Sequence, residues 1–425
     1  MNSMFSTSSE RMKDVYFTEL YRSPYLKGLK FTFTQGSRER TFDLVLRHSS
    51  VAILLYHTVL KKFVFVRQFR PAVLVGHILR LPENFGKQLK EIDWSKYDAS
   101  EGYTLELCAG LIDKDLPTID IMKEEIEEEC TQYLFYAEID DSMKISEGGG
   151  NVNEGEVITK VFLTQDEALA FLNNDYCLGP PSMLYALLWW FAHKNGQRKT
   201  SSMQNAYTWK PKNVVPLKDF KFEKLLSSKR FVPYRMQFTL GPLTRTWDLA
   251  LCDDSVSILL FNETLKEIVL VQRFRPAALV GQARHRSPAG TELESIDWSS
   301  QPAEWAYTLE LCTGHYRKGS SEEEIEARVK KIAALKCGFA LDSIHFVRSY
   351  IVGISFAGDR QRVYYAKVTN SMRIPGWNQY EDITPFSIPC SDIPSFLCDE
   401  APTSPPSVLF MLQWFLNNEK KCFDR

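Results

Sequence analysis

Several features that would assign a sequence to a class at once are missing here. The longest apolar run, Met183 to Ala192, is ten residues long, about half of what a membrane-spanning helix needs. Neither sign of charge dominates, because 51 Lys and Arg residues stand against 53 Asp and Glu residues, which argues against a general polyanion binder. The polar N-terminus has no apolar signal core. We therefore expect neither a membrane nor a nucleic-acid partner.

Common catalytic and disulfide signatures are also missing. The nine cysteines are an odd number with no CxxC pair, which favours reduced thiols and a cytoplasmic location over a disulfide framework. The run 148–150 is three glycines but does not open an apolar helix, so it is not a dinucleotide-binding loop. The seven histidines lie in no Ser/Asp context that would indicate a catalytic triad.

What the sequence does contain is an internal repeat. Four segments of the first half return 204 or 205 residues later, and a fifth returns after 225 residues. The pairs are 42–56 with 247–261, 66–76 with 271–281, 92–94 with 296–298, 104–108 with 308–312, and 180–191 with 405–415. We predict one domain over residues 1–195 (the first copy), a polar linker over 196–213, and a second domain over 214–425 (the second copy).

The coarse order of elements is similar in the two copies. In the first copy, residues 50–56 and 63–69 are β-branched and aromatic runs that predict a hairpin. The segment TLELCAG (104–110) predicts a strand that ends in a small-residue turn. Residues 118–130 have helical spacing, 134–139 predict a strand, and 183–193 predict an amphipathic helix. Strands and helices mixed in one domain favour an α/β or α+β layer sandwich.

A run of glutamates carries the densest functional signal. Glu124, Glu125, Glu127, Glu128 and Glu129 lie within the predicted helix, and spacings of three and four place Glu125, Glu128 and Glu129 on one face. Such a face is either a solvated charged surface or a site for Mg²⁺ or Mn²⁺, which prefer carboxylates together with a substrate phosphate.

On these residues the sequence resembles the Nudix hydrolases. Taking Gly110 as the first position of their fingerprint, the three glutamates that hold metal in that family match Glu125, Glu128 and Glu129. Three other positions depart from the fingerprint: Leu116 replaces a Glu, Glu124 replaces an Arg, and Thr131 replaces the closing Gly. The resemblance implies two tandem α/β/α sandwich domains with mixed sheets.

Further segments resemble the UDP-sugar pyrophosphatase branch of that family. They are FRPAV, ELCAGL, GGGNVNEGEVI (148–158) and the terminal apolar helix, in the same order. The resemblance implies Mg²⁺-dependent hydrolysis of a nucleoside-diphosphate sugar, of UDP-glucose type or ADP-ribose, to a nucleoside monophosphate and a sugar phosphate. It also implies that Glu154 and Glu156 include the water-activating carboxylate; otherwise they belong to an acidic surface loop.

The second copy differs at these positions. Ile332, Leu335 and Lys336 align with the three metal-binding glutamates, and such side chains cannot hold a hard divalent cation. The first copy in turn lacks 22 residues that the second has between Cys337 and Tyr364. These include Gly358 to Gln361, which resembles a substrate-proximal Gly-x-Arg-Gln segment of the family and makes Arg360 a candidate substrate-binding residue.

Two arginines and the repeat itself complete the predictions. Arg70 and Arg275 lie in Phe-Arg-Pro tripeptides and are either phosphate ligands or parts of a structural corner at a strand end. Members of the resembling branch are homodimers, so the constant offset predicts that the two copies pack as an intrachain pseudo-dimer. The alternative to an enzyme is an inactive nucleotide-sugar binding or scaffold protein.

Overall fold

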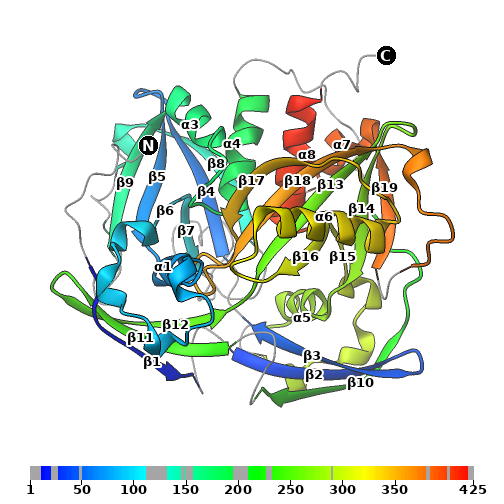
Figure 1. Ribbon diagram of the computed structural model, residues 1–425, viewed down its shortest axis with the longest axis horizontal. Coiled ribbons are helices and arrows are strands. Elements are labelled where there is room, and N and C mark those ends of the chain that lie inside the picture. Colours follow the sequence, from blue (N-terminus) through cyan, green and yellow to red (C-terminus); the bar gives the residue numbers. More distant parts are fainter. Residues whose placement is uncertain are drawn as a thin grey trace.

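The computed structural model describes residues 11–20, 27–46, 50–111, 132–144, 149, 157–194, 209–225, 232–288, 291–379, 383–399 and 403–419. It is a mixed α/β structure with two similar sheet-and-helix units, as the resemblance implied (Figure 1). In the part of the chain that it describes, no helix has both the length and the hydropathy needed to cross a bilayer.

The first copy is built on a six-stranded mixed sheet with the order β6-β5-β4-β7, in which β8 also pairs with β4 and β9 with β5. β4 and β5 form the predicted antiparallel hairpin, and β8 runs parallel to β4. The strands are β4 (Ser50–His57), β5 (Lys62–Phe69), β6 (Tyr103–Glu106), β7 (Cys108–Leu111), β8 (Gln132–Ile139) and β9 (Ile158–Thr164). Among its described residues, the α-helices are α1 (Pro71–Leu79), α3 (Gln165–Leu172) and α4 (Pro181–His193).

The second copy repeats this arrangement and adds a strand. Its seven-stranded sheet has the order β15-β14-β13-β18-β17, with β16 paired to β13 and β19 to β14. The strands are β13 (Asp254–Asn262), β14 (Glu267–Phe274), β15 (Tyr307–Glu310), β16 (Cys312–Tyr316), β17 (His345–Ile351), β18 (Arg360–Val368) and β19 (Ile383–Pro389). The helices are α5 (Pro276–His285), α6 (Glu322–Cys337), α7 (Ile393–Phe396) and α8 (Pro406–Asn418).

Strand register supports the alignment of the two copies around the 22-residue difference. Phe135 lies opposite Ile53 in the first copy, and Tyr364 lies opposite Ile258 in the second. Because Ile53 and Ile258 are 205 residues apart, Phe135 and Tyr364 are equivalent. The additional strand β17 belongs to the segment that the first copy lacks.

The predicted strand over 104–110 is in fact two strands. β6 pairs with β5, and after Leu107 the chain continues as β7, which pairs with β4. Gly110 therefore lies inside a strand rather than in the expected turn. The chain changes strand partners at Leu107, whose side chain is buried in the core, and the same crossing occurs at Leu311.

The two copies exchange their first strands. β1 (Lys13–Glu19) from the first copy pairs with β11 (Val232–Leu240), next to β12 (Leu243–Leu251). β10 (Leu217–Lys224) from the second copy pairs with β2 (Lys27–Gln35), next to β3 (Arg38–Leu46). Figure 1 shows one of these three-stranded sheets below α1 and the other below α5.

The sheet of β1, β11 and β12 covers the core around Phe69 of the first copy, and the sheet of β10, β2 and β3 covers the core around Phe274 of the second. Phe238 on β11 packs against Phe69, with ring centroids 5.9 Å apart, and Phe33 on β2 packs against Phe274 at 5.7 Å. These are equivalent contacts, because both Phe33–Phe238 and Phe69–Phe274 are 205 residues apart. The helices α4 and α8 also pack together. The two copies therefore pack on each other through their N-terminal strands, as the offset predicted.

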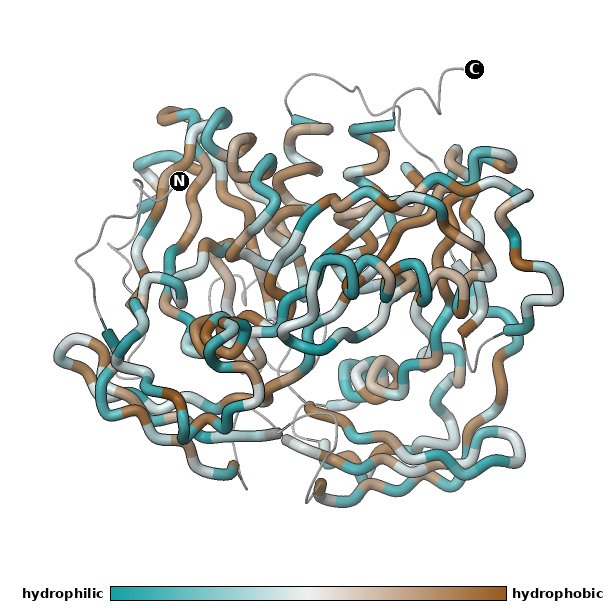
Figure 2. The backbone as a smooth tube through the Cα atoms, in the orientation of Figure 1, coloured by the Kyte–Doolittle hydropathy of each residue, from teal (hydrophilic) through white to brown (hydrophobic). Residues whose placement is uncertain are grey.

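Apolar residues explain these contacts. Figure 2 shows hydrophobic residues concentrated on the strands of the large sheets and on α1. The residues buried in the large shared core come from both sheets together with α4 and α8. Two smaller cores lie under the three-stranded sheets, and each contains residues from both copies.

Candidate functional site

The predicted metal and water-activating residues, Glu125, Glu128, Glu129, Glu154 and Glu156, lie outside the described residues. Among the residues that the structure does describe, no group of three or more His, Cys, Asp or Glu side chains is arranged to hold a metal ion. The described residues do include the strands and arginines of the first copy on either side of the glutamate run, and the equivalent positions of the second copy.

Arg70 lies at a corner between a strand and a helix. It directly follows β5 and precedes Pro71, the first residue of α1. A residue before proline is held in extended conformation, and proline at the first helical position has no N–H to leave unpaired. The Arg70 guanidinium makes a bidentate ion pair with Glu106, with Nε–Oε1 and Nη2–Oε2 distances of 2.7 Å each.

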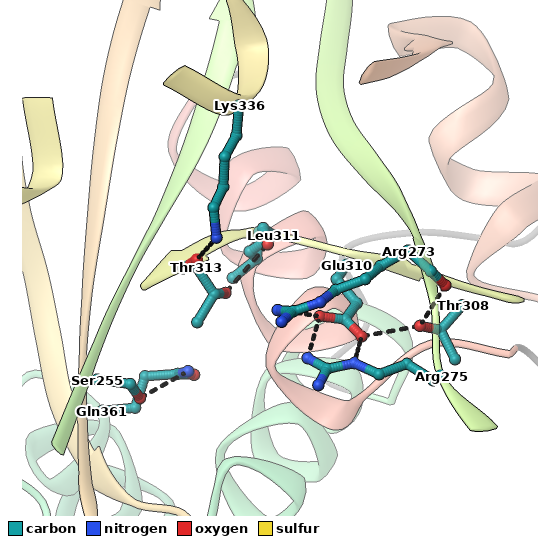
Figure 3. A network of polar contacts seen from close by, with 9 residues as sticks. All are labelled: Ser255, Arg273, Arg275, Thr308, Glu310, Leu311, Thr313, Lys336 and Gln361. Atoms are coloured by element: carbon teal, nitrogen blue, oxygen red, sulfur yellow. Dashed lines mark hydrogen bonds and ion pairs between the residues drawn. The ribbon is translucent and has the colours of Figure 1, made fainter. Parts of the chain in front are cut away.

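The second copy contains the same corner. Arg275 pairs with Glu310 through Nε–Oε1 and Nη2–Oε2 contacts of 2.6 and 2.7 Å. The hydroxyl of Thr308 donates to Glu310 at 2.8 Å, as Thr104 does to Glu106 at 2.6 Å. Figure 3 shows this group, in which Arg273 from β14 also approaches the Glu310 carboxylate, at 3.8 Å.

Opposing effects set the pKa of these two carboxyl groups. Burial raises the pKa of Glu106, but the charge of Arg70 and the hydrogen bonds from Arg70 and Thr104 together lower it below its usual range. In Glu310 the effect of burial is likewise outweighed by Arg275, with Arg273 and Thr308 adding to it. Both carboxylates therefore remain ionised at neutral pH and hold the arginines in place.

The roles of the candidate substrate ligands on these strands stay predictions. Two guanidinium nitrogens of Arg70, and two of Arg275, contact a carboxylate. The structural corner considered from the sequence is therefore present in both copies. Gly110 lies opposite Val51 on the neighbouring strand. At the equivalent Gly314, a Cβ atom would lie 2.7 Å from Ile332, so glycine lets α6 pack closely on the sheet.

The second copy places a lysine where the first has a predicted metal ligand. Helix α6 begins with a capping box between Ser321 and Glu324 and ends at Gly338, which has a left-handed φ of 73°. Ile332 on this helix is buried in the core. The Lys336 ammonium turns toward the sheet and donates a 2.5 Å hydrogen bond to the carbonyl of Thr313 (Figure 3). An ammonium and apolar side chains do not fit a divalent cation.

Arg360 lies at the contact between the copies. Its backbone N–H donates to Asp254 at 2.9 Å, and its guanidinium carbon lies 5.9 Å from the ring centroid of Tyr176, a residue of the first copy. Burial, together with the nearby charge of Arg80, lowers the pKa of Arg360. Substrate binding by Arg360 also stays a prediction.

An ion pair between the copies was not predicted from the sequence. Arg80, just after α1, pairs with Asp254 through Nε–Oδ2 and Nη2–Oδ1 distances of 2.7 and 2.5 Å, and Nη2 also donates to the carbonyl of Gly358. The Asp254 side chain is 1% exposed and that of Arg80 is 15% exposed. Gly358 has a φ of +61°, and a Cβ there would lie 1.8 Å from the carbonyl oxygen of Ala72.

The repeat contains one indication of Glu106 and Glu310, the acidic partners of the two arginines, which were not predicted. TLELC occurs unchanged in both copies, and its glutamates are Glu106 and Glu310. Charged residues inside two otherwise apolar strands need partners, and the two Phe-Arg-Pro segments supply them.

No family model matches the chain. The chain is 30% identical over 215 residues to the uridine diphosphate glucose pyrophosphatase NUDT14 of Bos taurus, covering 43% of this chain and 96% of that protein. It is 28% identical over 173 residues to a GDP-mannose pyrophosphatase of Cronobacter sakazakii, covering 35% of this chain and 78% of that protein. A crystal structure of an ADP compounds hydrolase aligns with a TM-score of 0.31 and 11% identity, over 46% of this chain and 91% of that one.

The identity to the Bos taurus protein, over nearly its whole length, shows that the chain belongs to the Nudix hydrolases. The two relatives are pyrophosphatases of nucleoside-diphosphate sugars, and each matches less than half of this chain.

Proposed function

We propose that the chain is a Mg²⁺-dependent hydrolase of a nucleoside-diphosphate sugar, with its active site in the first copy. The observation that carries the proposal is the 30% identity to a UDP-glucose pyrophosphatase across 96% of that protein. The first copy is the one with carboxylates at the three metal-binding positions of the fingerprint, since Ile332, Leu335 and Lys336 occupy the equivalent positions of the second.

In the proposed reaction, water attacks one phosphorus of the diphosphate and the bridging P–O bond breaks. The products are a nucleoside monophosphate and a sugar 1-phosphate, or ribose 5-phosphate if the substrate is ADP-ribose. Mg²⁺ or Mn²⁺ bound to Glu125, Glu128 and Glu129 would stabilise charge on the phosphoryl oxygens. Glu154 or Glu156 accepts the proton of the attacking water.

Around that site, the chain's own strands and arginines orient the substrate. Arg70, fixed by Glu106, directs its guanidinium from the end of β5, and Gly110 presents backbone on β7. Arg275 and Arg360 extend the proposed binding surface into the second copy.

The test compares Glu129→Gln with Glu127→Gln in the full chain. Both substitutions remove one negative charge from the same run of glutamates, but only Glu129 aligns with a family metal ligand. Over a panel of UDP-, GDP- and ADP-linked sugars with Mg²⁺, we expect the parent and Glu127→Gln to release nucleoside monophosphate. Glu129→Gln is expected to lose at least about 100-fold in kcat/KM, the cost of losing a key electrostatic contact in the transition state.

Equal activity of Glu129→Gln and the parent would remove this metal site from the proposal. A parent protein that binds a nucleotide sugar but hydrolyses none would establish the alternative, an inactive binding or scaffold protein. A specific observation favours that alternative: Glu124 stands where the family fingerprint has an arginine.

A further inference from the structure

Basic side chains gather on the face of the second sheet that carries α6. Arg273 comes from β14, Arg275 directly follows that strand, and Arg328 and Lys336 come from α6. Arg273, Arg275 and Glu310 lie on this face because Arg273 continues the alternation of Val269 and Val271, which pack against α6. In Figure 3 the Lys336 side chain reaches the sheet beside the Arg273–Glu310–Arg275 group.

The chain's crossing at Leu311 brings these groups to one place. Glu310, the last residue of β15, lies opposite Val271 on β14, and Thr313, two residues after the crossing, lies on β16 opposite Ser257. Arg275 contacts Glu310, the residue before the crossing, and Lys336 contacts the carbonyl of Thr313. Arg328 donates to the carbonyl of His315 further along β16, at 3.0 Å.

Among the described side chains of this group, four cations surround one carboxylate, that of Glu310, and Arg273 makes a further contact as well. Glu310 neutralises one guanidinium and lies near a second. Burial lowers the pKa of Lys336, and the charges of Arg273 and Arg328 lower it further. Cationic side chains that repel one another at a half-buried site are stabilised when an anion joins them.

The first copy shows that this charge is specific to the second. Residue by residue, Arg70, Thr104 and Glu106 of the first copy repeat Arg275, Thr308 and Glu310. By the same offsets, however, Gln68 takes the place of Arg273, and Glu129 takes the place of Lys336. Both differences make the second copy more positive. The two positions are close enough for the charge of Arg273 to lower the pKa of Lys336.

From this arrangement we infer that the second copy is a metal-independent binding site for a small anion with two linked phosphate groups. Lys336, Arg273 and Arg275 would supply the positive charge for which a metal is otherwise needed. Guanidinium groups suit bidentate contact with phosphoryl oxygens, and an ammonium acts as a compact point charge. Cations on both α6 and β14 favour a diphosphate over a single phosphate.

Calorimetric titration of the full chain with inorganic pyrophosphate, in EDTA, tests the inference. We expect binding by the parent that weakens with added salt, and weaker binding of inorganic phosphate. Lys336→Met and Arg273→Gln, the latter installing the residue of the first copy, should each raise Kd about tenfold or more. Lys331→Met is the matched control, because Lys331 is exposed on the same helix, and its Kd should equal that of the parent.

Several results would overturn the inference. They are a parent that does not bind pyrophosphate in EDTA, unchanged binding by Lys336→Met and Arg273→Gln, or equal affinity for phosphate and pyrophosphate. Lys336→Arg keeps the charge and should retain binding, so a loss of binding in Lys336→Met alone is not a folding defect if both variants melt at the parent's temperature. The titration involves no hydrolysis, and its outcome does not depend on the proposed enzymatic function.

Discussion

The two Phe-Arg-Pro corners have the same internal geometry but different surroundings. In each, an arginine at the end of a strand pairs with a glutamate through two contacts of 2.6–2.7 Å. Around the second corner lie Arg273 and Lys336, whose counterparts are Gln68 and Glu129. The corner therefore belongs to the framework that both copies need, and the chemistry of each copy depends on the residues placed next to it.

Separating the two copies is expected to have the largest effect on the fold. Residues 209–425 alone would lose β2 and β3. Phe31 and Phe33 of β2 cover the core around Phe274. We expect this fragment to self-associate or to remain largely unfolded, because an exposed apolar core and unpaired strand edges favour association. Light scattering coupled to size-exclusion chromatography measures the outcome.

Coexpression with residues 1–208 is the control and should restore a one-to-one complex. A fragment of residues 209–425 that is folded and monomeric by itself would show that the strand exchange is dispensable.

The ion pair between the copies comes next in expected size. Asp254→Asn leaves the Arg80 guanidinium, 15% exposed, without its charged partner. Breaking a buried pair in this way typically costs about 3–5 kcal/mol of the free energy of unfolding. Urea unfolding of the full chain measures the loss.

Asp253→Asn is the matched control, since that neighbouring side chain is exposed and should change stability by less than about 0.5 kcal/mol. Equal stability of the Asp254→Asn and Asp253→Asn proteins would contradict a role for the pair in holding the copies together.

A smaller effect should distinguish the two corners from each other. Arg70 is 15% exposed whereas Arg275 is 41% exposed, so water can solvate Arg275 more fully when its partner is removed. We expect Glu106→Gln to cost about 3 kcal/mol and Glu310→Gln about 1 kcal/mol at neutral pH. Equal losses in urea unfolding would show that the surroundings of the corner do not set its energetics.

The stabilisation that Glu106 and Glu310 provide at the two corners should also depend on pH. Because the pKa of Glu106 and that of Glu310 are lower in the folded chain, their stabilisation is present above the unfolded value of about 4.3 and is lost as the pH falls through the folded value. The difference in stability between the parent and Glu106→Gln should therefore shrink between pH 5 and the acid limit. A difference that stays constant down to pH 3 would contradict this linkage.

Local sequence patterns were sufficient for much of the fold. Alternating and apolar runs predicted the hairpin of β4 and β5 and the helix that ends at His193, because those structures depend on neighbouring residues. The break at Leu107 was not predicted, since the change of strand partner depends on which strand lies beside the chain rather than on local propensity. The exchange of β1 and β10 is non-local for the same reason.

The candidate site divides in a similar way. The lysine at position 336 and its inability to bind metal could be predicted from alignment of the two copies alone. The pairing of Arg80 with Asp254 could not, because the residues at the equivalent positions are His285 and Ser49, so the repeat offers no second example. The positions of the metal-binding and water-activating glutamates of the first copy stay predictions.

Strand exchange also determines which substitutions each half of the gene can accumulate independently. A change in Phe238 alters the wall of the first copy's core, although it is encoded in the second. Among the described residues, the two cores under the three-stranded sheets include none from α6. The two halves therefore depend on each other at their packing surfaces, whereas the solvent-facing side of α6 can change without altering the core of the first copy.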